Sequence, residues 1–256
     1  MAKPKILITN DDGIDAPGIK HLWRALSDFA ELAIVAPLHQ KSGCSLGLTL
    51  HLPLTIQNVP WEKNCPAWKV DGTPADCVRL GLSMILDFKP DLIVSGINRG
   101  SNAGRNALYS GTVGGVIEAA MHDIFGIAFS CENYMNPNYE IAEKYILEIV
   151  SHFLDAPHTK GTVLNVSFPD TDKFKGIKVA RQGMGLWVES PEKRLHPDGD
   201  FHYYWAGMQW SHQEEHEESD VHLLKQGYIT IVPLQIHQLT HNDFFDHHKE
   251  AFNKTY

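Results

Sequence analysis

Short apolar runs alternate with stretches of helical periodicity through the first 170 residues of the chain, and few folds accommodate that pattern. The apolar runs predict five strands, at residues 5–9, 32–36, 91–95, 127–130 and 162–167. The stretches between them predict four helices, at residues 18–29, 74–86, 112–122 and 139–154. Strands that are apolar throughout are typical of parallel sheets buried on both faces. We therefore predict an α/β fold, with a mostly parallel sheet covered by helices on both faces.

The character of the sequence changes after about residue 175. Strand-like pieces at residues 176–181 and 201–205 lie among Gly, Pro and polar residues. A short helix from Asp220, a strand at residues 228–233 and a polar tail follow. This pattern predicts a hairpin or an extended arm, of the kind that often mediates contacts between subunits.

The length of 256 residues is ample for a full hydrophobic core. We expect a single domain over residues 1–256, with a core at about residues 1–180 and a hairpin and C-terminal arm at about 181–256. The contents of 43% hydrophobic and 21% charged residues are ordinary for a globular protein, which argues against a disordered or fibrous chain.

The formal net charge of −9 disfavours a nucleic-acid polymer or an anionic membrane as the partner. Residues 195–224 contain seven acidic side chains and no Lys or Arg, so this segment carries −7 and the rest of the chain −2. The core is therefore nearly neutral, and it does not exclude a small anionic ligand held in one local site.

The four cysteines, at positions 44, 65, 77 and 131, form no CxxC pair and no zinc-knuckle spacing. Reduced thiols of this kind are typical of cytoplasmic proteins. The longest apolar runs are far too short to span a bilayer, and the first residues show no signal-peptide core. We therefore expect a cytoplasmic protein that does not contact a membrane.

Polar loops follow several of the predicted strands, and in a parallel sheet ligands bind beyond the carboxyl ends of the strands. The first strand leads into residues 10–13, the second into residues 37–43 and the third into residues 96–102. A fourth loop ends at residues 109–112, where a helix begins. Four oxygen-rich loops therefore converge on one edge of the sheet, which predicts the binding site there.

Asp11 and Asp12 are adjacent carboxylates at the end of an apolar strand, and a bound cation would relieve their repulsion. Ser42 and Asn98 supply neutral oxygens from neighbouring strand ends, and such oxygen ligands suit Mg²⁺ or Mn²⁺. Local sequence alone equally allows a loop at residues 11–13 that caps the next helix. The other strand ends favour a metal site with these four residues as ligands.

A glycine-rich run at residues 110–115 opens a predicted helix. The free N–H groups and partial positive charge at a helix N-terminus suit a phosphate, although small residues that only cap a helix give the same pattern. We assign phosphate or substrate binding to residues of this run and of the neighbouring loops, namely Asn10, Gly43, Asn102, Ser110, Gly111 and Thr112.

A cation beside a phosphate-binding helix start indicates phosphoester hydrolysis, because the cation orients the phosphate, offsets its charge and acidifies a water. Asp11 or Asp12 would accept the proton from that water. The chain has no GxxxxGK[ST] element of the P-loop enzymes. A covalent phospho-Asp intermediate would need a DxD arrangement with a neutralising lysine, which we do not find.

These motifs and several others resemble those of the SurE family, the survival-protein-E nucleotidases. The matching segments cover nearly the whole chain in the family's order. They are residues 8–13 with 16–18, 35–37 with 42–43, 71–78, 95–98 with 100, 102 and 104, 109–114, 164–166, 219–220, 227–229 and 233–234.

The resemblance implies a metal-dependent 5′/3′-nucleotidase, a phosphoric monoester hydrolase that converts nucleoside 5′- and 3′-monophosphates to nucleoside and phosphate. Some members of the family also trim short polyphosphate. The resemblance implies one divalent ion per subunit, Mg²⁺ or Mn²⁺, held by Asp11, Asp12, Ser42 and Asn98. It also implies a Rossmann-like core and a C-terminal arm exchanged between the subunits of a homodimer or homotetramer.

The chain departs from the family's usual pattern in three places. Leu38 and His39 stand where an acidic residue and an arginine are common, which leaves the base preference open. Gly114 and Gly115 stand where the helix start is usually richer in alanine, a mild change that should not abolish phosphate binding. Residues 189–219 match weakly and are expected to form a family-variable hairpin.

Two further patterns have both a functional and a structural explanation. His212 and His216 flank Glu215, but their order is not that of a His-Glu-x-x-His zinc helix, so we favour solvated surface histidines. Tyr109 and the aromatic residues 203–205 would stack on a base, although hairpin aromatics more often pack against a subunit or the core.

The alternative to an enzyme is a nucleotide-binding regulatory protein with the same core and no turnover. The paired carboxylates Asp11 and Asp12 favour the enzyme, because a pure binder does not need them.

Overall fold

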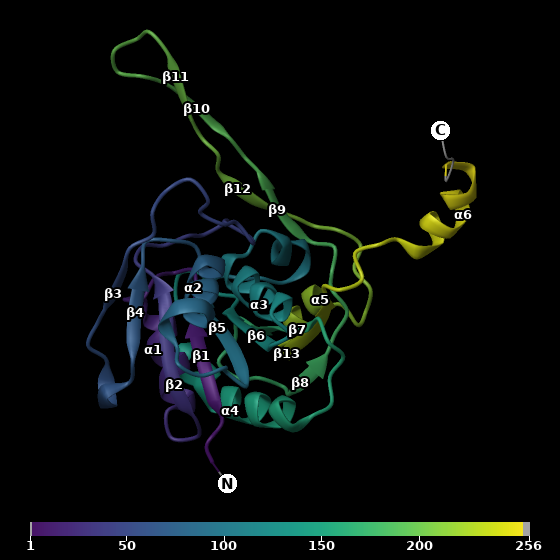
Figure 1. The fold of residues 1–256 in the computed structure, drawn as a ribbon. Helices are drawn as coiled ribbons and strands as arrows, with labels where there is room; N and C mark the ends of the chain where they lie inside the picture. The colour runs from purple at the N-terminus through teal and green to yellow at the C-terminus, as the bar shows by residue number, and fades with distance from the viewer. Residues whose placement is uncertain (1, 253–256) are drawn as a thin grey trace.

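The computed structural model describes residues 2–252, which form a nine-stranded sheet with helices on both faces and a long arm (Figure 1). The sheet order is β3-β4-β2-β1-β5-β6-β7-β13-β8. Its strands are β1 (Lys5–Thr9), β2 (Glu31–Pro37), β3 (Ile56–Asn58), β4 (Ala67–Val70), β5 (Leu92–Arg99), β6 (Phe125–Cys131), β7 (Thr162–Phe168), β8 (Ile177–Val179) and β13 (Ile229–Gln235). Two neighbouring pairs, β3 with β4 and β13 with β7, are antiparallel, and the other pairs are parallel. The prediction of a mostly parallel, Rossmann-like α/β sheet is confirmed.

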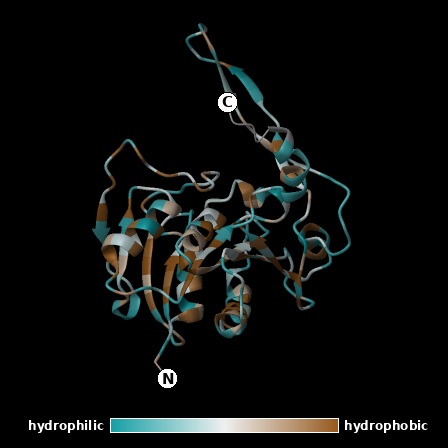
Figure 2. Ribbon diagram, turned by 45° about the vertical axis from the view of Figure 1, so that its right-hand side comes forward, coloured by the Kyte–Doolittle hydropathy of each residue, from teal (hydrophilic) through white to brown (hydrophobic). Residues whose placement is uncertain are grey.

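Helices cover the sheet in two layers, and the strands are apolar on both sides as the sequence predicted. Helices α1 (Pro17–Leu26) and α4 (Tyr139–Asp155) pack together, and so do α2 (Pro74–Leu80) and α3 (Gly111–Met121). In β1, Ile6 and Ile8 join a core cluster that contains Leu22 of α1, whereas Leu7 joins a second cluster with Val78 of α2. This alternation follows from the two-residue period of a strand. Figure 2 shows the resulting hydrophobic strands at the centre of the molecule.

Local capping sets the start of α2. The Thr73 hydroxyl accepts from the Asp76 N–H at 3.1 Å, and the Asp76 carboxylate accepts from the Thr73 N–H at 2.9 Å. The predicted helix at residues 74–86 is confirmed to within one residue, although it changes type: α2 ends at Leu80 and continues as a π turn at Gly81–Ile85. Glycine is a weak helix former, and Gly81 lies against the side chain of Leu7.

Several elements escaped the sequence analysis. Strands β3 and β4 lie in a stretch interrupted by Pro60 and Pro66, which hides the strand periodicity. A helix, α6 (Asn242–Phe252), occupies most of the predicted polar tail. Residues 1 and 253–256 of the expected domain lie outside the described residues.

The predicted hairpin is confirmed as an arm of four short strands that projects from the body (Figure 1). The strands pair as β9 (Leu186–Glu189) with β12 (Met208–Ser211) and as β10 (Glu192–Leu195) with β11 (His202–Trp205). All four cysteines are free thiols. Within residues 2–252, no helix combines the length and the apolar character that a membrane crossing requires.

A buried carboxylate, Asp220, joins three segments at the root of the arm. It is fully buried at the start of α5 (Asp220–Lys225). It accepts the N–H of Gly104 at 2.9 Å, of Gly183 at 2.8 Å and of Val221 at 2.7 Å. The turn that begins at Gly104, the entry to the arm and helix α5 therefore share one acceptor.

Replacing Asp220 by Ala leaves three buried N–H groups without this acceptor. We expect the free energy of unfolding to fall by about 3 kcal/mol, because each unsatisfied buried donor is costly. Urea denaturation followed by circular dichroism measures the change. Asp200→Ala, at an exposed position of the arm, is the matched control. A loss below about 1 kcal/mol for Asp220→Ala would show that other groups satisfy these donors.

Candidate active site

The predicted site residues gather at one cavity of about 560 Å³ at the carboxyl edge of the sheet. Six of the ten predicted residues line this cavity: Asp11, Ser42, Gly43, Asn98, Asn102 and Ser110. The loop after β2 reaches the loop after β1, because the Lys41 N–H donates to the Asp11 carbonyl at 2.7 Å. The convergence of strand ends therefore places the cavity where the sequence predicted it.

A bulge in β5 positions Asn98. The pairing of β5 with β6 shifts register between Ser95 and Asn98, and a bulge of this kind re-aims the side chains that follow it. Gly96 has φ +129°, and a Cβ atom there would lie 2.4 Å from the carbonyl oxygen of Phe129. Only glycine therefore fits at the turn that brings Asn98 to the cavity.

The amide of Asn98 has a fixed orientation. Its Nδ2 donates to the Gly100 carbonyl at 2.8 Å and to Oδ1 of Asn102 at 3.3 Å. Because both bonds use the nitrogen, Oδ1 of Asn98 is left as an acceptor. This oxygen suits a cation.

Asp11 is buried against the start of α3, with an exposed fraction of 3%. Its carboxylate accepts a hydrogen bond from the Thr112 hydroxyl. A Cβ atom on Gly111 would lie 2.8 Å from Cβ of Asp11 and 2.7 Å from Sγ of Cys44, so glycine permits this close approach. Burial, and to a lesser extent the charge of Asp12, raise the pKa of Asp11 to about 6.

Asp12 is the second carboxylate of the site. Its Oδ2 accepts the Arg99 N–H at 3.0 Å, which ties the end of β1 to the end of β5. Burial raises the pKa of Asp12, and the bond and charge of Arg99 oppose that rise. Two adjacent carboxylates are thus desolvated together, and a cation bound there would offset the cost.

The donor set fits a hard divalent ion. Within the described part of the chain no three His, Cys, Asp or Glu side chains form a metal-binding group, so neutral oxygens must complete any set around the two aspartates. Oδ1 of Asn98 and the hydroxyl of Ser42 are of this kind, and Mg²⁺ and Mn²⁺ prefer oxygen ligands.

Two amide side chains that line the cavity each have a buried Nδ2 donor without a hydrogen-bond acceptor among residues 2–252. These donors are Nδ2 of Asn102, which is 5% exposed, and Nδ2 of Asn106, which is 8% exposed. Oδ1 of Asn106 accepts the Trp187 N–H at 3.0 Å, so its amide orientation is also fixed. Buried donors without partners are rare in native proteins, and this pair suits an anionic ligand such as phosphate.

Three residues that we assigned to phosphate binding lie behind the cavity wall. The Thr112 hydroxyl donates to Asp11, and Gly111 makes room for that contact. Nδ2 of Asn10 donates to the Gly13 carbonyl at 2.8 Å and holds the loop after β1. In this structure these residues position Asp11. Ser110 lines the cavity, and its hydroxyl also caps α3 by accepting the Val113 N–H at 3.2 Å.

The sequence analysis missed several cavity residues besides Asn106. The Arg99 guanidinium lies 4.4 Å from the ring centre of Tyr134 and donates to its hydroxyl at 3.1 Å. Glu132, directly after β6, and Trp187 on the arm also line the cavity. Glu132 could have been found, because it directly follows β6, a parallel strand that ends at the same edge of the sheet as β1.

The structure also shows where the histidine and aromatic patterns of the sequence lie. His212 lines a neighbouring pocket, and Nδ1 of His216 accepts the Glu218 N–H at 3.1 Å. Tyr109 lines the cavity with its ring 60% exposed. The aromatic residues 203–205 lie on the arm and face solvent rather than the cavity.

Comparison with known proteins gives a consistent result. The family model described as survival protein SurE matches residues 6–189. A 5′-nucleotidase SurE from Protochlamydia amoebophila is 48% identical over 254 residues, which are 98% of this chain and 97% of that protein. A 5′-nucleotidase SurE from Thermosipho africanus is 36% identical over 249 residues, which are 96% of this chain and 97% of that protein. The crystal structure of the SurE protein from Aquifex aeolicus has a TM-score of 0.82 at 36% identity, and covers 97% of this chain and 99% of that one.

Because Asp11 is buried, we expect that replacing it with a neutral residue increases the free energy of unfolding of the metal-free protein. The folded pKa of Asp11, about 6, lies above the ordinary value of 3.8, so the carboxyl has no cost below pH 3.8 and its full cost above about pH 6. That cost is roughly 3 kcal/mol. We expect Asp11→Asn to be more stable than the wild type at pH 7.5 with chelator, and the difference to vanish near pH 4. Thermal unfolding at the two pH values measures it, and equal melting temperatures at pH 7.5 would contradict the assignment.

Proposed function

The chain belongs to the SurE family, and from this premise we propose that it is a divalent-metal-dependent nucleotidase. In this proposal it hydrolyses nucleoside 5′- and 3′-monophosphates to nucleoside and phosphate. One observation carries the proposal: Asp11, whose carboxylate is buried next to the half-buried Asp12, lines one cavity together with Asn102 and Asn106, whose amide donors have no acceptor among residues 2–252. The first pair suits a cation and the second an anion, which is the charge arrangement that a bound phosphate with its metal ion needs.

Asp11, Asp12, Ser42 and Asn98 would hold the metal ion. When bound, a divalent ion offsets the charge of the phosphate and acidifies a water molecule. We propose one ion per subunit, Mg²⁺ or Mn²⁺, since both take these oxygen ligands.

The chain's own residues then have separate tasks. Asn102 and Asn106 donate to the phosphate oxygens, and Arg99 adds positive charge at the cavity wall. One carboxylate of the Asp11–Asp12 pair accepts the proton of the attacking water. Thr112 and Asn10 position this pair through the hydrogen bonds described above.

The substrate in this proposal is a small molecule. The cavity volume of about 560 Å³ is typical of small-ligand sites and excludes neither 5′- nor 3′-phosphates. We extend the proposal to removal of terminal phosphate from short polyphosphate, whose end presents the same phosphoryl group. The compartment we propose is the cytoplasm, since all four cysteines are free thiols.

Phosphate release from AMP with Mn²⁺ tests the proposed function. Asp12→Asn removes one charge of the metal site, so we expect kcat/KM to fall by about 100-fold or more, and chelator to abolish wild-type turnover. Asp15→Asn changes an exposed carboxylate three residues away and is expected to keep full activity. Equal activity of Asp12→Asn and wild type would remove the metal-site assignment. If the wild type binds AMP and releases no phosphate, the chain is instead a nucleotide-binding regulatory protein.

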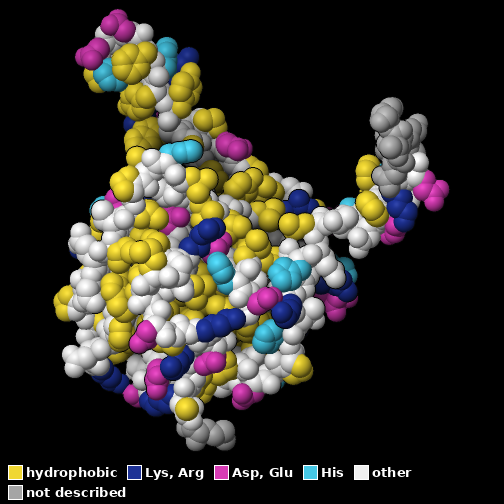
Figure 3. Space-filling model, in the orientation of Figure 1, with side chains coloured by type: hydrophobic (Ala, Val, Ile, Leu, Met, Phe, Trp, Pro, Cys, Tyr) yellow, Lys and Arg dark blue, Asp and Glu magenta, His cyan; other side chains and the backbone are white. Residues whose placement is uncertain are grey.

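We also propose that the chain forms a homodimer or homotetramer through its two projecting segments. The arm exposes Leu195, Phe201, Tyr204, Trp205 and Met208, each more than half exposed. The segment that ends in α6 exposes Leu239 at 89% and Phe244 at 65%. Figure 3 shows hydrophobic side chains on both projections. Apolar clusters of this extent on a soluble chain mark protein–protein contacts.

Charged residues on α6 test the oligomer. We expect the double variant Phe244→Asp and Phe245→Asp to have the mass of a monomer in size-exclusion chromatography with light scattering, because two carboxylates would be buried in the contact. Leu147→Asp, on the exposed face of α4, is the control that keeps the wild-type mass. A wild type with the mass of a monomer would contradict this part of the proposal.

A further inference from the structure

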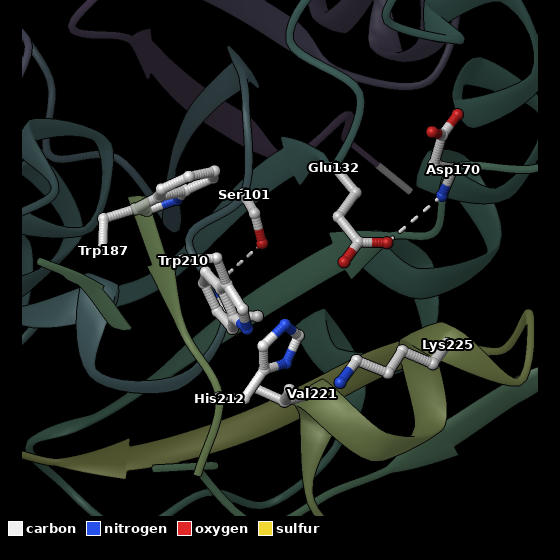
Figure 4. Close-up of a pocket in the computed structure, with 9 residues that line it drawn as sticks. Ser101, Glu132, Asp170, Trp187, Trp210, His212, Val221 and Lys225 are labelled. Carbon is white, nitrogen blue, oxygen red and sulfur yellow. Dashed lines mark hydrogen bonds between the residues drawn. The ribbon is translucent and has the colours of Figure 1, made fainter. Parts of the chain in front are cut away.

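A second pocket, of about 330 Å³, opens beside the catalytic cavity (Figure 4). The two share three lining residues, Ser101, Glu132 and Trp187, so they are contiguous. The metal-ligand candidates do not line the second pocket. A ligand whose phosphate lies in the catalytic cavity can therefore extend into it.

The spacing of the strands gives the distance over which such a ligand would extend. The ends of β1, β5 and β6 carry Asp11, Asn98 and Glu132, and these strands are consecutive in the sheet. Neighbouring strands lie about 4.8 Å apart, so Glu132 is roughly 10 Å from the β1 end. That separation matches the reach of a nucleoside monophosphate from its phosphate to the far edge of its base.

The walls of the second pocket suit a flat aromatic ring. Trp187 and Trp210 meet edge to face, with ring centres 5.4 Å apart. Trp210 packs on the cluster of Ala103, Val221 and Leu224, which fixes one side of the pocket. An indole surface stacks on any nucleobase, so these residues favour a base without selecting one.

The polar groups of the pocket, in contrast, can distinguish one nucleobase from another. Figure 4 shows the Glu132 carboxylate and the Lys225 ammonium directed into the pocket, with the Trp210 indole on another side. Oε2 of Glu132 accepts the Asp170 N–H at 3.3 Å, which orients the carboxylate and leaves its other lone pairs free. The pocket thus presents a two-oxygen acceptor and a separate donor.

We propose that this pocket is the base site of the nucleotidase and that it reads guanine, with Glu132 as the specificity-determining residue. Guanine offers two adjacent donors, N1–H and the N2 amino group, which match the two oxygens of a carboxylate. Its O6 and N7 accept hydrogen bonds and match Lys225. Adenine presents an acceptor at N1, which a carboxylate repels. The inference rests on the proposed function, since it locates the rest of the same substrate.

Kinetics on three phosphate esters test the inference. With Mn²⁺, we expect the wild type to prefer GMP to AMP in kcat/KM by about tenfold or more. We expect Glu132→Gln to lower the ratio of kcat/KM for GMP to that for ribose 5-phosphate by a similar factor, through KM. Lys225→Met should lower the same ratio by a smaller factor. Glu148→Gln, on the exposed face of α4, should keep the wild-type ratio.

Binding without turnover gives a second readout. Guanosine titrated into the chelator-treated protein should change the fluorescence of Trp187 and Trp210, and adenosine should bind more weakly. Glu132→Gln should remove the difference between the two nucleosides. A tryptophan emission spectrum of Glu132→Gln that equals the wild-type spectrum before titration would show that the variant is folded.

Three results would overturn the inference. One is a wild type that prefers AMP, or shows no preference. Another is a Glu132→Gln variant with the wild-type GMP preference. The third is an equal loss of kcat for ribose 5-phosphate and GMP in that variant, which would make Glu132 part of the reaction rather than of base recognition. Failure of the proposed function is distinct, because the wild type would then release no phosphate from ribose 5-phosphate or AMP.

Discussion

The burial of two adjacent carboxylates at the end of β1 is the constraint on which the rest of the site depends. Desolvation raises the pKa of both Asp11 and Asp12, so the fold carries an unfavourable charge arrangement at neutral pH. The surrounding structure offsets it only in part, with the Thr112 hydroxyl on one carboxylate and the Arg99 N–H on the other. A cation held between the two carboxylates, as proposed above, would offset part of this desolvation cost.

Most of the site residues that sequence reasoning predicted line this cavity, because the signals are local. Each predicted ligand lies at the end of an apolar strand or in the loop that follows it, and the edge rule for parallel sheets brings these strand ends together regardless of the details of packing. The core strands were predicted for the same reason: β1 at residues 5–9 needs only its own apolar side chains to be recognised. Asn102 and Ser110 also lie on loops that the rule places at the edge, and both line the cavity.

The site residues and elements that the sequence did not predict depend on contacts between distant residues, and such contacts leave no local sequence pattern. Thr112 faces Asp11 because Gly111 permits the helix to approach, and nothing in residues 110–115 distinguishes that contact from phosphate binding. The place of Asn106 at the cavity depends on a contact with a distant residue, because its Oδ1 accepts the N–H of Trp187, 81 residues later in the chain. Glu132 is different, because it directly follows the apolar strand β6 and therefore does carry the local signal that marks Asp11. Short strands such as β3 are stabilised by pairing with a neighbouring strand and are too short to show an alternating apolar pattern. Helix α6 contains few apolar residues, so its sequence shows little helical periodicity.

The arm is joined to the cavity by hydrogen bonds at its root, and these fix the position of Trp187 in the proposed base site. Oδ1 of Asn106 holds the main chain of Trp187, while Nδ2 of the same side chain faces the cavity. Asp220 and Glu215 accept N–H groups from Gly183 and Gly185 at the entry to the arm, so the position of Trp187 is fixed from both sides. One asparagine therefore links the phosphate end of the cavity to the indole that bounds the second pocket. Contacts made by the arm in an oligomer would therefore lie one hydrogen bond away from a side chain that also lines the catalytic cavity.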